Sequence, residues 1–107
     1  MNTEEELNAI FGNWRDDSKL YTRAELYALI KIKNPNISIN PWLPSDFCYN
    51  RCNKGIKSLF KTRTHLFEYC GRNSYKILGK DFPYNGDIVQ GGTTVGKWSN
   101  GKIVTLI

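Results

Sequence analysis

The chain has 107 residues, 40% of them hydrophobic and 23% charged, a composition that fits one globular domain and excludes disordered and fibrous classes. No apolar run approaches the ~20 residues of a membrane helix, and acidic residues replace the basic start of a signal peptide, so we expect a cytoplasmic protein without a membrane partner. The formal net charge of +5 is uneven, because residues 1–17 carry one base against five acids, a net of −4, and the remaining ninety carry fourteen bases against five acids, a net of +9.

The N-terminal segment predicts a short amphipathic helix that packs beside the main fold. Thr3 can cap this helix, with Glu6 in the capping-box position, and Gly12 is the expected end. Its apolar residues recur at helical spacing, and they are Leu7, Ile10 and Phe11. Residues 12–21 have the composition of a loop.

A second helix is predicted to begin after Thr22. The hydroxyl of Thr22 can accept the backbone N–H of Glu25 while the carboxylate of Glu25 reaches back, which makes a capping box. The expected buried stripe consists of Leu26, Leu29 and Ile30. The helix should end near Lys33, because Pro35 disfavours helical geometry in the residue before it. A connector over 34–44 follows.

A third, short helix is predicted over residues 46–54. Ser45 is its expected N-cap, and Gly55 is its expected stop. One face would bury three side chains, those of Phe47, Cys48 and Cys52. The opposite face would expose a stripe of hydrogen-bonding side chains formed by Asp46, Tyr49, Asn50 and Asn53.

From residue 65 the apolar residues alternate, which predicts strands. Residues 65–69 and 75–78 are expected to form a hairpin, with Arg72 at its tip. Three further strands are expected at 87–90, 93–98 and 102–106. The sequence therefore predicts an α+β fold in which short helices precede a small antiparallel β meander.

The region between Phe47 and Phe67 contains no acidic residue. Its five bases are Arg51, Lys54, Lys57, Lys61 and Arg63, and Arg72 and Lys76 extend the series into the hairpin. Cations without intervening acids are typical of a surface that contacts phosphates, although a lysine-rich loop is more commonly a solvated surface.

Two helices followed by a hairpin with a basic tip is the order of a winged helix-turn-helix, in which the second helix enters the major groove and the hairpin lies on the backbone or in the minor groove. Asn50 or Asn53 could bond an adenine edge, and Tyr49 could reach a phosphate. The alternative is that this helix face is merely exposed. We expect a double-stranded DNA-binding module that is sensitive to sequence or to base modification.

Several strings of the chain resemble a poorly characterised winged-helix module of bacterial and phage proteins that is often associated with restriction endonucleases. They are LYTRAEL at 20–26, LPSDFCYNR at 43–51, NKG at 53–55, LFE at 66–68 and YKILG at 75–79. The resemblance covers residues 20–98 and implies binding of DNA, modified DNA included, in or beside defence systems. Cys52 departs from the pattern, which has a small polar residue there.

Together with this resemblance, the pattern of elements predicts one domain over residues 1–107. Its expected parts are an acidic N-terminal helix over 1–17, a winged-helix core over 20–80 and a C-terminal β meander over 81–107.

Four residues have the spacing of a zinc site. Cys48, Cys52, His65 and Cys70 satisfy the pattern C-x3-C-x12-H-x4-C. The predicted elements argue against a finger, because the first two cysteines fall on a helix and the last two ligands fall on or beside a strand. We expect reduced thiols, with Cys48 and Cys52 in the core, and no metal or other cofactor.

Catalytic motifs are missing from the sequence, so we expect that the protein is not an enzyme. His65, the single histidine, has no nucleophile elbow, and five acids remain after residue 17. Trp42, Tyr84 and Trp98 could line a pocket for an extruded base, although core packing is the commoner role. A second function class stays open, namely a protein-binding inhibitor or adaptor of a nucleic-acid-processing system, of the kind that mobile elements encode.

Overall fold

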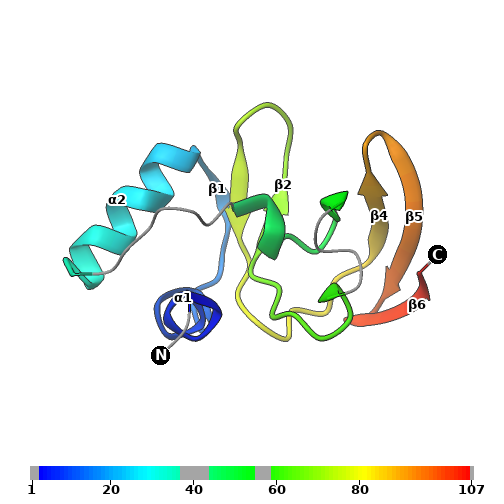
Figure 1. The fold of residues 1–107 in the computed structure, drawn as a ribbon, viewed down its shortest axis with the longest axis horizontal. Helices are drawn as coiled ribbons and strands as arrows, with labels where there is room; N and C mark the ends of the chain where they lie inside the picture. The colour runs from blue at the N-terminus through cyan, green and yellow to red at the C-terminus, as the bar shows by residue number, and fades with distance from the viewer. Residues whose placement is uncertain (1–2, 37–43, 55–58, 107) are drawn as a thin grey trace.

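The computed structural model describes residues 3–36, 44–54 and 59–106 (Figure 1). In chain order the elements are α1 (Thr3–Phe11), β1 (Asp16–Tyr21), α2 (Arg23–Lys33), the 3-10 helix η1 (Pro44–Phe47), β2 (Phe67–Tyr69), β3 (Tyr75–Ile77), β4 (Gly86–Gln90), β5 (Thr93–Ser99) and β6 (Lys102–Leu106). Two three-stranded antiparallel sheets have the strand orders β1-β3-β2 and β4-β5-β6. The predicted α+β class is confirmed.

Both N-terminal helices form where the sequence predicts them. At the start of α2, Glu25 N–H donates to Thr22 Oγ1 at 3.1 Å, and Thr22 N–H donates to Glu25 Oε1 at 2.9 Å, so the capping box is complete. The buried stripe of α2 contains Leu26 and Ile30. In α1 the fully buried residues are Leu7 and Phe11, which join the same core.

Strand β1 occupies residues that the sequence analysis assigned to a loop, so that prediction is wrong for 16–21. Four of its six residues are exposed, which hides the alternation that identifies a strand. Pairing holds it in place, because β1 lies antiparallel to β3 with Tyr21 opposite Tyr75. The Tyr21 hydroxyl also donates to Asp16 Oδ2 at 2.8 Å, which joins the two ends of the strand.

The helix predicted over 46–54 is absent. A single 3-10 turn, η1, is followed by an irregular segment in which Cys48 bridges to Phe67 and Arg51 bridges to Val89, both in parallel. The physical reason is that the side chains of this segment are buried in two separate cores. Cys48 packs into the first core, whereas Tyr49 and its neighbour Cys52 pack into a second one, and a helix with a single apolar face could not supply both.

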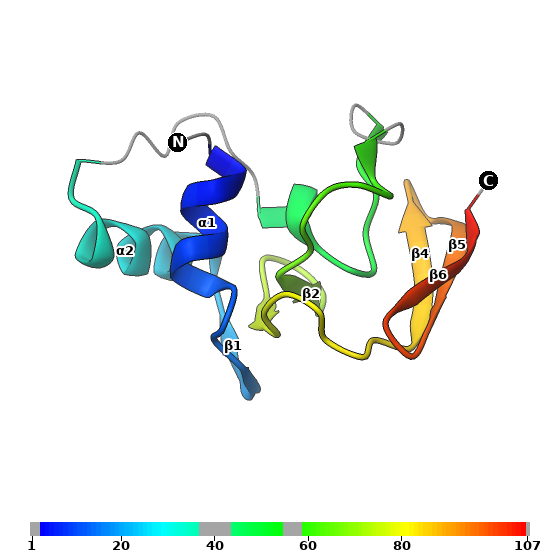
Figure 2. The same ribbon diagram turned by 90° about the horizontal axis from the view of Figure 1, so that it is seen from below.

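The C-terminal strands confirm the predicted meander. In Figure 2 the sheet β4-β5-β6 lies at the end of the molecule opposite the helices. Gly91 and Gly92 form the β4–β5 turn, and Asn100 and Gly101 form the β5–β6 turn, all with positive φ. The second core that this sheet covers includes Tyr49, Cys52, Phe60, Leu78, Tyr84, Ile88, Val95 and Trp98.

Tyr49 connects this second core to the rest of the fold. Its hydroxyl donates to Gly79 O at 2.7 Å and accepts the backbone N–H of Phe82 at 3.1 Å. Its own carbonyl accepts Trp98 Nε1–H at 2.6 Å, and its ring stacks on Tyr84 with centroids 5.2 Å apart. With 2% of its surface exposed, Tyr49 is a structural residue and lies on no outward stripe.

In the described ranges, no helix combines the length and the apolar character that crossing a membrane requires.

Replacing Tyr49 with Phe should lower the free energy of unfolding by about 1–3 kcal/mol, because Gly79 O and Phe82 N–H lose their shared partner. Denaturant unfolding at constant m-value measures the change. Tyr69→Phe is the matched control, since the described residues make hydrogen bonds to the backbone of Tyr69 and none to its hydroxyl. Equal stability of both variants would contradict the role of the Tyr49 hydroxyl.

Candidate nucleic-acid interface

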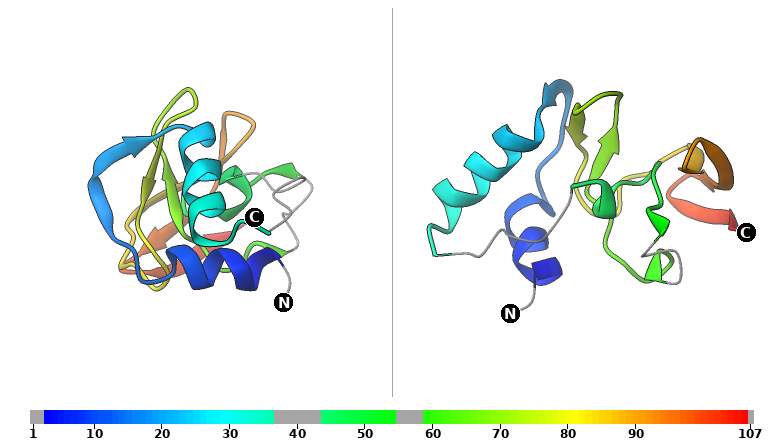
Figure 3. Two further views of the ribbon diagram at one scale, coloured as in Figure 1. Left: turned by 90° about the vertical axis from the view of Figure 1, so that its left-hand side faces the viewer. Right: turned by 45° about the horizontal axis from the view of Figure 1, so that its top comes forward.

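A groove of about 560 Å³ lies between the start of α2, the segment 45–51 and the β2–β3 hairpin. The right-hand view of Figure 3 shows the first turn of α2 beside this hairpin. The groove is lined by Arg23, Ala24, Tyr27, Ser45, Arg51, Tyr69, Asn73 and Tyr75. None of these described residues is acidic, so two cations share an open, aromatic surface.

Both arginines of the groove are held on tyrosine rings. The guanidinium carbon of Arg23 lies 5.2 Å from the ring centroid of Tyr27, and Arg23 Nε–H donates to the Tyr27 hydroxyl at 2.6 Å. The guanidinium carbon of Arg51 lies 4.2 Å from the ring centroid of Tyr69. Stacking occupies the face of a guanidinium and leaves in-plane N–H groups for a planar or tetrahedral anion.

The hairpin is tied to the start of α2. Asn73 has a φ of 50°, and its Oδ1 accepts the backbone N–H of Arg23 at 2.9 Å. Its neighbour Arg72 is exposed in the turn, at the tip where the sequence predicts it. The hydrogen bond therefore places a third arginine close to one edge of the groove.

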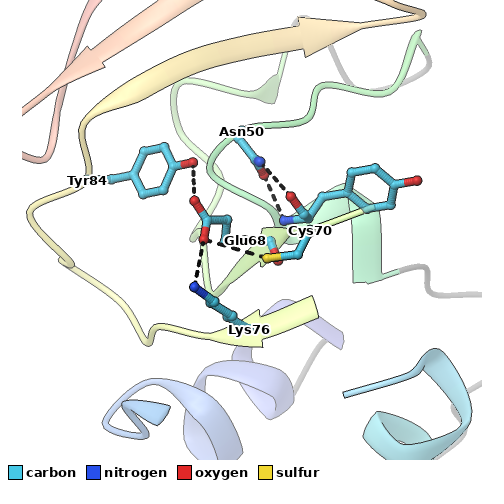
Figure 4. A network of polar contacts seen from close by, with 6 residues as sticks. Asn50, Glu68, Cys70, Lys76 and Tyr84 are labelled. Carbon is cyan, nitrogen blue, oxygen red and sulfur yellow. Dashed lines mark hydrogen bonds and ion pairs between the residues drawn. The ribbon is translucent and has the colours of Figure 1, made fainter. Parts of the chain in front are cut away.

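The predicted base-reading stripe is not formed, and that prediction is wrong. Figure 4 shows Asn50 held against β2, where its Nδ2–H donates to Tyr69 O at 2.8 Å and its Oδ1 accepts Tyr69 N–H at 2.8 Å. Asn53 Nδ2 donates to Ser45 Oγ at 2.8 Å and to Asp46 Oδ1 at 2.6 Å. These amides are therefore used inside the fold: Asn50 bonds the backbone of β2, and Asn53 bonds two side chains of η1.

The other predicted cations have different surroundings. Lys54 and Lys61 are exposed, and Lys57 lies outside the described residues. The Arg63 guanidinium carbon lies 4.8 Å from the ring centroid of Phe47. Lys76 Nζ lies 4.0 Å from Glu68 Oε1, in an ion pair on the sheet. The structure thus gathers Arg51 and the hairpin at the groove and spreads the remaining cations elsewhere.

A polar network surrounds Glu68 on β2, at the centre of Figure 4. The Tyr84 hydroxyl donates to Glu68 Oε2 at 2.7 Å, and Cys70 Sγ lies 3.7 Å from Glu68 Oε1. Burial and the Glu68 carboxylate raise the pKa of the Cys70 thiol. The thiol therefore stays protonated at neutral pH and is a poor nucleophile or metal ligand.

The four residues with zinc spacing do not meet. Cys48 packs in the first core, Cys52 in the second, and Cys70 is exposed. Within residues 3–36, 44–54 and 59–106, no three His, Cys, Asp or Glu side chains form a group that could hold a metal ion. His65 instead packs among rings, with its centroid 4.4 Å from that of Phe60 and 5.1 Å from that of Trp98.

The sequence analysis missed most of the groove, because Arg51 is the one lining residue that it singled out as a site residue. Arg23, Tyr27 and Tyr69 were not singled out as site residues. The four-residue spacing of Arg23 and Tyr27 on one helix face was an available signal. No comparable signal pairs Arg51 with Tyr69, because that contact depends on how the segment 45–51 lies against β2.

Comparison with known proteins gives a family. The family described as "Domain of unknown function (DUF7225)" matches residues 3–105. The chain belongs to this family. It is 46% identical over 63 residues to "Uncharacterized protein YnaC" of Bacillus subtilis (strain 168), a match that covers 53% of this chain and 22% of the relative. The matched stretch therefore spans about a fifth of the length of that relative. No solved structure matches the chain.

Asn50→Ala should destabilise this DUF7225 domain by about 1–3 kcal/mol, because both hydrogen bonds to the backbone of Tyr69 are lost. Thermal or urea unfolding provides the measurement. Asn13→Ala, in an exposed loop, is the control and should change stability by less than about 0.5 kcal/mol. A fully stable Asn50→Ala protein would instead favour the outward-facing helix of the sequence prediction.

His65 should make the stability depend on pH. Burial lowers its pKa from 6.5 to about 4, and Arg63 adds to this while Glu4 opposes it. Between these two pH values the unfolded chain binds a proton that the folded chain does not, so stability should fall on acidification by about 1.4 kcal/mol per pH unit. The readout is the difference between the wild type and His65→Phe, because the carboxyl groups titrate in both. Parallel pH profiles would show that His65 binds its proton equally well in the folded and the unfolded chain, and would contradict the lowered pKa.

Proposed function

We propose that this chain is a double-stranded DNA-binding module that contacts the sugar–phosphate backbone through the groove between α2 and the β2–β3 hairpin. The observation that carries the proposal is the pair of tyrosine-stacked arginines, Arg23 and Arg51, in a groove without acidic lining residues. Arginines restrained in this way lose little side-chain entropy on binding a phosphate.

In the groove, Tyr69 and Tyr75 add neutral donors to these cations. Tyr27, Tyr69 and Tyr75 all line it, and burial raises the pKa of Tyr75, so its hydroxyl keeps its proton. Tyrosine hydroxyls and arginines are common partners of DNA phosphates, which fix register and orientation. The lining residues therefore offer several donors to one sugar–phosphate backbone.

The arrangement of elements supports a winged-helix relationship. Helices α1 and α2 precede the β2–β3 hairpin, whose exposed Arg72 would act as the tip of a wing. The place of a recognition helix is taken by η1 and the segment that follows it. Because Asn50 and Asn53 are used within the fold, we propose recognition that depends on backbone contacts and DNA shape more than on base edges.

The charge distribution agrees with this proposal. Nine net positive charges lie after residue 17, whereas the acids Glu4, Glu5 and Glu6 lie together at the start of the chain. Long-range attraction of a polyanion raises the rate of encounter and then weakens with salt. The relative from Bacillus subtilis is several times longer than the matched stretch, which is compatible with a module that serves different larger proteins.

Replacing Arg23 and Arg51 together by Gln should lower affinity for duplex DNA at least about tenfold, since a hydrogen bond to a charged group contributes about 1.5–3 kcal/mol. The plot of log affinity against log salt should also flatten by about 0.9 for each phosphate contact that is lost. Fluorescence anisotropy with a labelled random duplex, methylated and unmethylated, at a series of salt concentrations provides both numbers.

Lys97→Ala is the matched control, because it removes an exposed cation of β5 that does not line the groove. Its affinity and salt slope should equal those of the wild type. A wild-type protein that binds no duplex at low salt would refute the proposal. The result would favour the alternative function, a protein-binding inhibitor or adaptor. If Lys97→Ala, which removes one charge, lost about half as much binding free energy as the double variant, which removes two, binding would follow net charge and the groove would have no special role.

A further inference from the structure

A second hollow, of about 290 Å³, opens beside the second core. It lies between residues 62–65, residues 80–82 and the end of β5, and none of its lining residues belongs to the groove. In Figure 1 the segments that carry residues 60–66 and 79–83 run near each other at the bottom of the molecule, away from the hairpin tip. Backbone hydrogen bonds from Leu78 and Gly79 to Leu66 O hold these segments together.

Four aromatic side chains line this cavity, and they are Tyr49, His65, Phe82 and Trp98. The His65 and Trp98 rings are nearly perpendicular, at 81°, whereas the Tyr49 and His65 rings are inclined by 37° with centroids 5.4 Å apart. Arg15 packs on Phe82, with its guanidinium carbon 5.3 Å from the ring centroid. Walls of this kind favour a flat ligand that can stack.

His65 gives the cavity an unused polar group. Its side chain is 6% exposed, and its Nε2 is buried without a hydrogen-bond partner in the part of the chain that the structure describes. A buried polar atom without a partner destabilises a fold and calls for a ligand, a water or another explanation. Because burial keeps the imidazole neutral, it offers one donor and one acceptor, which suits the edge of an uncharged heterocycle.

The cavity also has an excess of cations among its lining residues. Arg63 and Lys80 line it together with one acid, Asp81. Lys80 is exposed, and Arg63 is partly exposed while it stacks on Phe47. The fold thus places positive charge near a neutral aromatic interior, an arrangement that matches a ligand with a flat base and an anionic group.

We propose that this cavity binds one nucleotide unit, with its base among the rings and hydrogen-bonded by His65, and with its phosphate at Arg63 and Lys80. The volume is at the small end of ligand pockets, which suits a single base. The ligand could be a free mononucleotide or one nucleotide of a single strand, since both present the same chemistry. This proposal is independent of duplex binding, because the groove and the cavity have no lining residue in common.

The test is a calorimetric and NMR titration with the four deoxynucleoside monophosphates, in parallel with the corresponding nucleosides. His65→Phe keeps a ring in place and removes the unpartnered nitrogen, so it should weaken binding of the preferred nucleotide about tenfold or more while the melting temperature stays equal or rises. Lys80→Ala should weaken the monophosphate and leave the nucleoside unchanged. Lys97→Ala, outside the cavity, is the control.

A single-stranded oligonucleotide distinguishes the two sources of the ligand. Tighter binding than the monophosphate, lost again in His65→Phe, assigns the site to a strand, whereas equal or weaker binding assigns it to the free nucleotide, and both results support the proposal. No saturable binding of either probe, or unchanged binding in His65→Phe, would overturn it and leave the cavity to water. The Arg23→Gln/Arg51→Gln variant should bind the monophosphate normally, so failure of one proposal is separable from failure of the other.

Discussion

The hydrogen bonds of Tyr49 are the constraint on which the remaining structure depends. Its hydroxyl joins the backbone at Gly79 and Phe82, and its carbonyl receives the indole N–H of Trp98. This one residue therefore fixes three parts of the fold: its hydroxyl holds the end of the first sheet and the loop before β4, and its backbone carbonyl holds β5, the middle strand of the second sheet. Two residues further along the chain, Arg51 lines the groove, so the same short segment supplies a wall of the cavity and a cation of the proposed DNA interface.

The parts of the fold that follow from local rules could be predicted from the sequence. A capping box and a three-to-four-residue apolar repeat identify α1 and α2, and alternating apolar residues with Asn–Gly and Gly–Gly turns identify the hairpins. Strand β1 could not be found in this way, because it is an edge strand with four exposed residues and its pairing partner lies more than fifty residues away. The segment after η1 was misread because its spacing fits a helix while its side chains serve two cores.

The candidate sites likewise contain some residues that local sequence signals identify and others that only long-range contacts bring together. Arg51 was singled out from charge and Arg72 from charge and its place in a hairpin turn, and Arg51 lines the groove. Asn50 was misplaced, because a polar residue beside apolar ones is typical both of an exposed helix face and of an amide that fixes a backbone. His65 was noticed for its spacing with cysteines, whereas its surroundings come from rings at positions 49, 60, 82 and 98 that no motif connects.

The bond from Trp98 to Tyr49 also affects how the chain can fold. It joins residues that are 49 positions apart, and both belong to the buried interior. Contacts of such long sequence separation form slowly, because the loop between them must be ordered before the contact stabilises anything. During synthesis, Tyr49 and Cys52 leave the ribosome well before β5 does, so they have no native apolar partners from that strand until it has been made. For this interval the apolar side chains of the second core lack part of their native cover, and apolar surface that is exposed during folding favours aggregation.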